Sequence, residues 1–366
     1  MRRATGATRA TRSAGATGAT RRSPATRAAR ALGLGAAAGT AWLLWRRLTE
    51  APISLGGRVV VITGGSRGLG LVLAREFAAH GCRLAICARD AEELERARRD
   101  LVERGADVYA AVCDVADEPR VRAFLSDVVA RYGRVDVLVN NAGIIQVGPL
   151  ETMSAQDFRH ALDVNFFGAL HTTLAVMPLM IRRHAGRIVN ITSIGGKVAV
   201  PHLLPYDCAK FAAVALSEGT RAELARHGIK VTTVVPGLMR TGSPPNALFK
   251  GKASLEYTWF ALGDATPLTA TSAERAARRI VEATRRGEAE VTLTWQARAL
   301  RLVAGVLPGA LADGLGAVNR LLPEPGGIGS AQLRGRDVAN ALTRSPVTAL
   351  LRRAARRNNE LAAPSA

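Results

Sequence analysis

A glycine-rich segment, Thr63 to Gly70, most constrains the fold of this chain. It follows an apolar run at 59–62, which predicts a buried strand, and it leads into a helix with an apolar face at 71–77. Glycines let the backbone approach a phosphate closely, and the free N–H groups and dipole of a first helical turn favour its charge. Gly64, Gly68 and Gly70 follow the spacing G-x-x-x-G-x-G, which differs from the commoner G-x-G-x-x-G turn. The segment therefore predicts a phosphate-binding loop.

Strand and helix patterns alternate downstream of this loop. Strands are predicted at 59–62, 83–88, 108–112, 135–139, 187–191, 230–235 and 289–293, and helices at 71–77, 92–103, 118–132, 157–183, 206–227 and 272–286. Continuous apolar strands separated by amphipathic helices indicate a parallel sheet that is covered on both faces. We therefore expect an α/β fold with a single doubly wound Rossmann-type parallel sheet and helical extensions at the termini. The connection at 237–260 is longer than a simple connector and predicts a lid.

The ends of the chain differ from its middle in charge. Of the net charge of +20, residues 1–49 carry +10 and residues 295–366 carry +6, which leaves +4 for the middle. Residues 1–30 are rich in Arg, Ala and Thr and have few apolar side chains, so we expect a disordered tail. Aromatic residues make up only 4% of the chain, and no basic stripe alternates with stacking side chains, which disfavours nucleic-acid binding.

Cysteine and histidine spacing gives no sign of a metal site. The four cysteines show no C-x-x-C pairing and lie on apolar segments, so we expect small core residues in a reducing compartment. The six histidines are scattered, without the spacing of metal ligands. No metal is expected.

Residues that can carry chemistry follow the fourth and fifth predicted strands. Asn140-Asn141-Ala142-Gly143 comes at the carboxyl end of the fourth strand, the edge at which such sheets bind ligands. Ser193 follows the fifth strand. Tyr206 and Lys210 are four residues apart on a predicted helix, which places both side chains on one face.

Taken together, these motifs resemble the short-chain dehydrogenase/reductase family in its common form. The resemblance covers about residues 56–294 and includes T-G-x-x-x-G-x-G, N-N-A-G, Asn165, Ser193, Y-x-x-x-K and P-G, in that order. It implies an NADP-binding Rossmann domain over 56–294. Residues 295–366, which include an apolar helix-like stretch at 300–322 and a basic helix at 347–359, form a mainly helical extension beyond the usual end of the family.

The resemblance implies an oxidoreductase that interconverts a carbonyl and a secondary alcohol. A carbonyl that accepts a hydride needs a proton near neutral pH, and a free Tyr has a pKa of about 10. We therefore expect Lys210, one turn away, to lower the pKa of Tyr206, and Ser193 to orient the substrate oxygen. By resemblance, Lys210 also holds the nicotinamide ribose, and Asn165 supports a water-linked proton route to it. The expected catalytic residues are Asn165, Ser193, Tyr206 and Lys210.

Two arginines indicate the cofactor. NAD enzymes usually end the second strand with an acid that accepts a hydrogen bond from the ribose 2′-OH, but here that strand is followed by Arg89. Arg67 adds a second guanidinium, and both have the planar geometry that suits a 2′-phosphate, so we expect NADP(H). Asp90 is expected to cap the next helix. The resemblance adds an adenine-contacting pair and a P-G-x-x-x-T contact to the nicotinamide amide. The residues expected to bind the cofactor are Thr63, Gly64, Ser66, Arg67, Gly68, Leu69, Gly70, Arg89, Asp114, Val115, Asn140, Ala142, Gly143, Tyr206, Lys210, Pro236, Gly237 and Thr241.

The substrate is expected to be a lipophilic small molecule. Apolar residues crowd the loop before Tyr206 and the predicted lid; they are Ile194, Val198, Val200, Leu203, Leu204, Leu248, Phe249, Leu255, Tyr257, Trp259 and Phe260. The family's two long helices, here 157–183 and 206–227, favour a homo-oligomer. The alternative is a non-catalytic NADP(H)-binding regulatory or scaffold protein of the same fold, but such proteins typically lose the Tyr or the Lys.

The uncharged run at 31–45, within an apolar helix expected at 31–50, has three interpretations. It is shorter than the ~20 residues that a spanning helix needs, although its tryptophans and flanking arginines suit a membrane interface. It is a membrane anchor, an Arg-rich targeting or secretory leader, or a helix that docks on the body. Export would separate the domain from its cofactor. We therefore expect a cytoplasmic catalytic domain that is membrane-associated through this segment.

Overall fold

The computed structural model describes residues 42, 51–266 and 270–361. The tail expected at 1–30 lies outside the described residues. So does the helix expected at 31–50, apart from Trp42. The fold below concerns residues 52–361.

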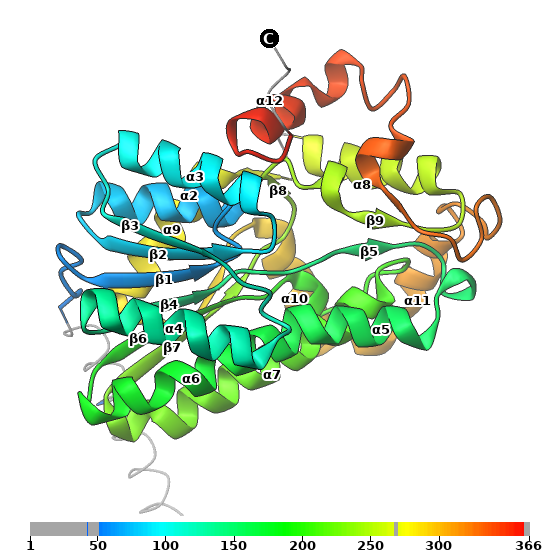
Figure 1. The fold of residues 1–366 in the computed structure, drawn as a ribbon. Helices are drawn as coiled ribbons and strands as arrows, with labels where there is room; N and C mark the ends of the chain where they lie inside the picture. The colour runs from blue at the N-terminus through cyan, green and yellow to red at the C-terminus, as the bar shows by residue number, and fades with distance from the viewer. Residues whose placement is uncertain (1–41, 43–50, 267–269, 362–366) are drawn as a thin grey trace, which may run out of the picture. The chain divides into compact units, whose positions relative to one another are not determined.

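A seven-stranded parallel sheet forms the centre of the molecule (Figure 1). Its strands are β1 (Val59–Thr63), β2 (Arg83–Ala88), β3 (Val108–Val112), β4 (Val137–Asn140), β6 (Gly186–Ile191), β7 (Ile229–Val235) and β11 (Glu290–Thr292). Their spatial order is β11-β7-β6-β4-β1-β2-β3. The strand order reverses between β1 and β4, and in such sheets ligands bind at the carboxyl ends of the strands beside this point. The expected doubly wound α/β fold is confirmed.

Helices cover both faces of the sheet (Figure 1). One layer contains α2 (Gly68–Ala79), α3 (Ala91–Glu103) and α9 (Ala273–Arg286); the other contains α4 (Glu118–Tyr132), α6 (Gly168–Arg182) and α7 (Leu204–Leu224). Alternate side chains of β1 go to the two layers, because Val60 and Ile62 pack with α2 whereas Val59 and Val61 pack with α4. Each layer is therefore a separate apolar core.

The long helix expected at 157–183 is interrupted. It consists of α5 (Ala155–Leu162), one π-helical turn at Asp163–Phe167, and α6. A π turn inserts an extra residue without ending the apolar pattern, so the sequence does not reveal it. The continuous stretch Ala155–Arg182 is long and apolar enough to cross a membrane, but 39% of its most apolar window is buried, and core helices meet the same criterion.

The segment expected to be a lid contains its own helix and short strands. These elements are β8 (Met239–Arg240), a 3-10 turn (Pro244–Asn246), β9 (Leu248–Phe249) and α8 (Ala253–Ala265). β9 pairs with β5 (Gln146–Val147), and β8 pairs with β10 (Thr271–Ser272). The sequence did not predict the helix and the short strands within 237–260.

The chain beyond β11 is mainly helical. It forms α10 (Trp295–Val306), α11 (Pro308–Asn319), the short strand β12 (Leu333–Arg334) and α12 (Ala349–Arg357). β12 pairs antiparallel with β9, so this extension continues the small sheet of the lid segment. In Figure 1, α12 (red) lies beside α8.

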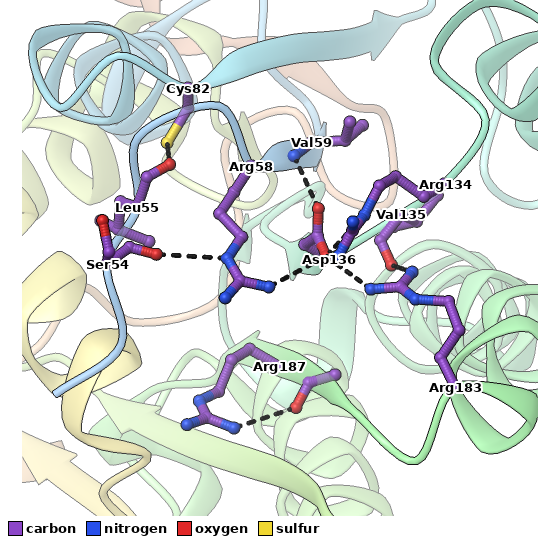
Figure 2. Close-up of polar contacts among 11 residues, drawn as sticks. Ser54, Leu55, Arg58, Val59, Cys82, Arg134, Val135, Asp136, Arg183 and Arg187 are labelled. Atoms are coloured by element: carbon purple, nitrogen blue, oxygen red, sulfur yellow. Dashed lines mark hydrogen bonds and ion pairs between the residues drawn. The ribbon is translucent and has the colours of Figure 1, made fainter. Parts of the chain in front are cut away.

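A buried carboxylate ties together the amino-terminal edge of the sheet (Figure 2). Asp136 is 3% exposed and accepts hydrogen bonds from the Val59 amide (3.0 Å) and from Arg58 (3.3 Å), Arg183 (2.5 Å) and Arg134. Burial alone would raise the pKa of this carboxyl. The hydrogen bonds from Arg134 and the Val59 amide and the nearby arginine charges outweigh burial and lower it. The cluster lies at the opposite end of the strands from the expected site.

Candidate active site

The glycine-rich loop joins β1 to α2 by a turn that only glycine fits. Gly64 and Gly68 have positive φ angles of 63° and 55°. A β-carbon on Gly70 would collide with the Gly64 carbonyl oxygen, and one on Gly64 would lie 2.9 Å from the backbone of Ala142. The loop therefore packs against the N-N-A-G segment after β4.

The side chains of the loop's Thr63 and of Asn141 fasten these two segments together. The amides of Asn141 and Ala142 donate to Thr63 Oγ1 at 3.0 and 3.1 Å. Asn141 Nδ2 donates in return to the carbonyls of Thr63 and Gly64, both at 3.1 Å. Asn141 was missed as a site residue, although it stands inside the N-N-A-G motif.

Asn140, which was expected to bind the cofactor, has its side chain in the core instead. Its Nδ2 donates to Asn190 Oδ1 at 2.8 Å, and its Oδ1 accepts from Thr172 Oγ1 at 2.6 Å. Alternation along β4 turns the side chains of Asn140 and Asn141 in different directions. Only the backbone of Asn140 is left to reach a ligand.

The π turn positions Asn165. Its Nδ2 donates to the carbonyls of Ile144 (3.1 Å) and Ala161 (3.0 Å), and its Oδ1 accepts from the Ile144 amide (3.3 Å). A β-carbon on Gly143 would lie 2.6 Å from Asn165 Oδ1 and 3.6 Å from Lys210 Nζ. The side chains of Asn165 and Lys210 thus approach the same exposed glycine.

Ser193, Tyr206 and Lys210 converge at the carboxyl edge of the sheet. Ser193 follows β6, and its Oγ accepts from the Gly195 amide at 3.0 Å. The Ser193 side chain lies close enough to the Tyr206 phenol to lower its pKa. Lys210 Nζ lies 5.6 Å from the centroid of the Tyr206 ring and donates to the Ile191 carbonyl at 3.0 Å. The structure therefore brings together the four residues that the sequence identified as catalytic.

Burial controls the acidities of this group. Burial raises the pKa of Tyr206 far above its ordinary value, and the nearby Ser193 side chain only partly offsets it. Burial also lowers the pKa of Lys210 to about 8. The expectation that Lys210 lowers the pKa of Tyr206 was wrong for this structure, because Lys210 is itself desolvated and faces a backbone carbonyl.

Two further buried carboxyls affect the acidity of Tyr206. Asp207 and Asp264 are 1% and 6% exposed, and the charge of each raises the pKa of Tyr206. Burial raises the pKa of Asp207 to about 8 and that of Asp264 to about 7. Asp207 Oδ2 accepts from the Val200 amide at 2.6 Å, whereas its Oδ1 has no partner among the described residues. Asp207 stands next to Tyr206 in the sequence, but nothing in the sequence connects Asp264, on α8, with the site.

The two arginines that were expected to select NADP(H) differ in their surroundings. Arg67 donates to both oxygens of Glu93 at 2.8 Å and pairs with Glu360 at 3.3 Å. The Arg89 side chain is 52% exposed, and its contact with Asp114 is 3.9 Å. Asp90 accepts from the Glu93 amide at 2.9 Å, which confirms it as the cap of α3. Arg89 is thus the more open of the two guanidinium groups.

The remaining expected cofactor residues lie along the same edge. Ser66 and Leu69 are buried in the glycine-rich loop, and Val115 contacts Gly168 of α6. Pro236 follows β7, and its carbonyl accepts from the Ile194 amide at 2.7 Å. Gly237 is too close to Thr294 Oγ1 for a β-carbon, and Thr241 Oγ1 donates to Ser243 at 3.0 Å.

Some of the apolar residues expected to line the substrate pocket are core residues instead. Phe249, Tyr257 and Phe260 are buried in a cluster that includes Leu351 of α12. The C-terminal extension covers them, which the sequence could not reveal. Cys208, on the exposed side of α7, was likewise wrongly expected in the core.

Comparison with known proteins decides the family. The family model for short chain dehydrogenases matches residues 58–247. This chain belongs to that family. The dehydrogenase is 38% identical over 245 residues to the dehydrogenase/reductase SDR family protein 7-like of Anopheles gambiae, which covers 65% of this chain and 75% of the relative. It is 39% identical over 195 residues to the putative ketoacyl reductase 1 of the granaticin polyketide synthase of Streptomyces violaceoruber, covering 53% of this chain and 72% of the relative.

A solved structure extends the likeness to the fold. The dehydrogenase superposes on a variant of actinorhodin polyketide ketoreductase with NADPH, with a TM-score of 0.59 and 28% sequence identity. That match covers 65% of this chain and 96% of the ketoreductase. The chain is therefore an oxidoreductase of the short-chain dehydrogenase family, which uses NAD(H) or NADP(H) on carbonyl or alcohol groups.

Proposed function

We propose that this dehydrogenase interconverts a carbonyl and a secondary alcohol with NADP(H), and that Tyr206 is its acid/base. The observation that carries the proposal is that Ser193, Tyr206 and Lys210 lie together beside the glycine-rich loop. Two hydroxyls from different elements thus lie where one substrate oxygen can contact both.

Each residue of the site has its own role in proton transfer. The cofactor, when bound, supplies or accepts the hydride. Tyr206 gives its phenolic proton to the substrate oxygen during reduction and takes it back during oxidation. Because burial raises the pKa of Tyr206, the phenol stays protonated at neutral pH, which suits the reductive direction. Ser193 donates to the same oxygen, and Lys210 with Asn165 provides the route by which Tyr206 regains a proton.

The first experiment removes the phenolic hydroxyl. We expect Tyr206→Phe to lower kcat by about 10²–10⁴-fold on any active carbonyl substrate, while the affinity for NADPH stays within about twofold. Tyr109→Phe is the matched control, because the Tyr109 hydroxyl bonds Asp127 on the surface, away from the site. An unchanged rate in Tyr206→Phe would refute the mechanism. If the wild-type protein bound NADPH but turned over none of a panel of carbonyls and alcohols, the non-catalytic alternative would be favoured.

We infer NADP(H) rather than NAD(H) from the charge around the adenosine end of the loop. The tight glycine cradle fits a dinucleotide phosphate, and the exposed Arg89 guanidinium at the end of β2 suits a 2′-phosphate. Arg67 can take part once it exchanges a carboxylate for the phosphate. The glycine cradle supports Thr63 to Gly70 as cofactor residues. The open Arg89 and its neighbour Asp114 support Arg89 and the Asp114-Val115 pair.

The cofactor choice is tested by kcat/KM for NADPH and NADH. Wild-type enzyme should prefer NADPH, and Arg89→Ala should lose about tenfold to a hundredfold with NADPH and little with NADH. Arg122→Ala, which removes another exposed arginine, on α4, is the control. A wild-type preference for NADH would contradict the inference.

We further propose a lipophilic substrate and a homo-oligomeric enzyme. Ile194, which follows Ser193, and Leu203, three residues before Tyr206, are half-buried, which supports an apolar substrate. Phe167 and Phe211, on the two helices expected to mediate assembly, are 40% and 43% exposed. Light scattering tests the assembly. Membrane contact of the cytoplasmic domain through 31–45 is tested by detergent fractionation, which compares the full chain with a chain that lacks residues 1–50.

A further inference from the structure

The last described residues of the C-terminal extension reach the glycine-rich loop. α12 packs beside α8 through Leu351, and a β-carbon on Gly242 would collide with Ala355, so this helix is pressed onto the lid segment. The chain then turns at Asn359, which has a positive φ of 59°. Residues 358–360, here named the C-terminal strap, follow the edge of the loop at Ser66, Arg67 and Gly68.

Asn358 occupies a backbone donor of the loop. Its carbonyl accepts from the Gly68 amide at 2.9 Å, an N–H of the first turn of α2 that has no acceptor within its helix. Its own Nδ2 donates to the Thr241 carbonyl at 2.9 Å. The side chain of Asn358 is fully buried between these two segments.

Asn359 binds the next part of the loop. Its Nδ2 donates to the carbonyls of Ser66 and Glu93, both at 2.8 Å, and its Oδ1 accepts from Arg96 Nε at 2.9 Å. These contacts are directional hydrogen bonds rather than apolar packing, so they hold the strap at one defined position on the loop.

Glu360 brings a carboxylate to the helix N-terminus. It is 4% exposed and pairs with Arg67 Nε at 3.3 Å, while Asn246 Nδ2 donates to its Oε2 at 2.7 Å. Its other oxygen, Oε1, lies so close to Gly68 that a β-carbon there would collide with it. An acidic group of the chain itself thus stands at the first turn of α2, where a phosphate would be favoured.

We propose that the C-terminal strap is an internal competitor of the cofactor: it occupies the phosphate-binding loop, and a dinucleotide binds fully only after the strap has left. This rests on the use of NAD(H) or NADP(H) at the glycine-rich loop. The strap holds the Gly68 amide and the Arg67 guanidinium, two donors that the cofactor needs. Its departure also frees Thr241 and Asn246, so cofactor binding is coupled to the lid segment through α12.

Binding of NADPH and NADH in the absence of substrate tests the competitor. Asn359→Gly removes the three side-chain hydrogen bonds while suiting the positive φ, and a chain ending at Arg357 removes the strap. Both should bind either dinucleotide about tenfold more tightly than the wild type, because less of the protein is held in the closed form. The matched control is Asn319→Gly, at the exposed end of α11, which should bind like the wild type.

Hydrogen exchange provides the second readout. NADPH should increase exchange at residues 358–360 in the full-length protein. If the truncated chain fails to fold, Asn359→Gly still decides the question. The proposal would be overturned if the dissociation constants of Asn359→Gly for NADPH and NADH equalled those of the wild type. It would also be overturned if this variant bound the dinucleotides more weakly, because the strap would then clamp the bound cofactor. Such a result would leave the proposed reaction standing, whereas failure of all variants to bind either dinucleotide would refute both the cofactor use and the competitor.

Discussion

The affinity for NADH should depend on pH through Glu360. Burial raises the pKa of its carboxyl from an ordinary 4.5 to about 7, and the charge of Arg67 and the hydrogen bond from Asn246 only partly oppose this effect. The groups around it are Arg67 at the start of α2, Glu93 and Arg96 on α3, and Asn246 of the lid segment. Glu93 is a like charge and adds to the rise.

The sign follows from linkage. An open strap exposes Glu360, which then has an ordinary pKa, so closing the strap takes up a proton between pH 4.5 and 7. The closed strap is therefore fully stable below pH 4.5 and loses stability as the pH rises to 7. At about 1.4 kcal/mol for each pH unit, the loss over this range is about 3 kcal/mol. The dissociation constant for NADH should fall by up to tenfold per pH unit between pH 5 and 7 and then level off.

Calorimetry with NADH measures this effect, because NADH lacks the 2′-phosphate that would itself titrate. Titrations in two buffers with different ionisation enthalpies count the protons, and we expect release of up to one proton per NADH near pH 6. Glu360→Gln keeps the side chain neutral, so its affinity should match the wild type at pH 5, be weaker at pH 8, and show no proton release. If Glu360→Gln and the wild type followed parallel pH curves, the reasoning would be refuted.

Three further predictions concern stability, acidity and the lid. Asp136→Asn should lower the free energy of unfolding by about 3 kcal/mol in urea titrations, because it leaves three clustered arginines without their shared carboxylate; a loss under 0.5 kcal/mol would contradict this. Asp207→Asn should move the alkaline limb of the pH–kcat profile to lower pH, because it removes a negative charge that raises the pKa of Tyr206; an unmoved limb would count against it. Glu256→Gln should speed hydrogen exchange in α8, because Glu256 accepts from His202 at 2.9 Å and from Trp259 at 2.7 Å; unchanged exchange would show that these bonds do not hold the lid.

The sequence predicted the central sheet closely because most of its strands are buried. β2 coincides with the predicted 83–88, since a buried parallel strand reads as one apolar run. The edge strand β3 also coincides with the predicted 108–112, although only Val108 in it is buried. The short strands β5, β9 and β12 have no such run, and their pairing depends on tertiary contacts alone. They could not be predicted from local pattern.

In the candidate site, too, features set by local sequence could be predicted and features set by tertiary contacts could not. Tyr206 and Lys210 share a helix face by spacing, so the sequence could place them together. The sequence does not show which residues of β4 point to which face of the sheet, so the direction of the Asn140 side chain could not be predicted. The π turn at Asn165 does not change the apolar pattern of the helix, so it could not be predicted either. Glu360 lies nearly three hundred residues from Gly68 in the sequence, and no local signal connects them.

The C-terminal extension explains why apolar lid residues are buried and why the glycine-rich loop is occupied. β12 pairs with β9, Leu351 joins the cluster with Phe249, and the strap bonds Gly68. These contacts lie in succession along one chain, so movement at the loop can reach the lid through α12 without a change in the central sheet. A cofactor that displaces the strap would therefore also loosen α8. Hydrogen exchange in α8 and at residues 358–360 should then rise together when NADPH is added, and in the Asn359→Gly variant both should be raised before any cofactor is present.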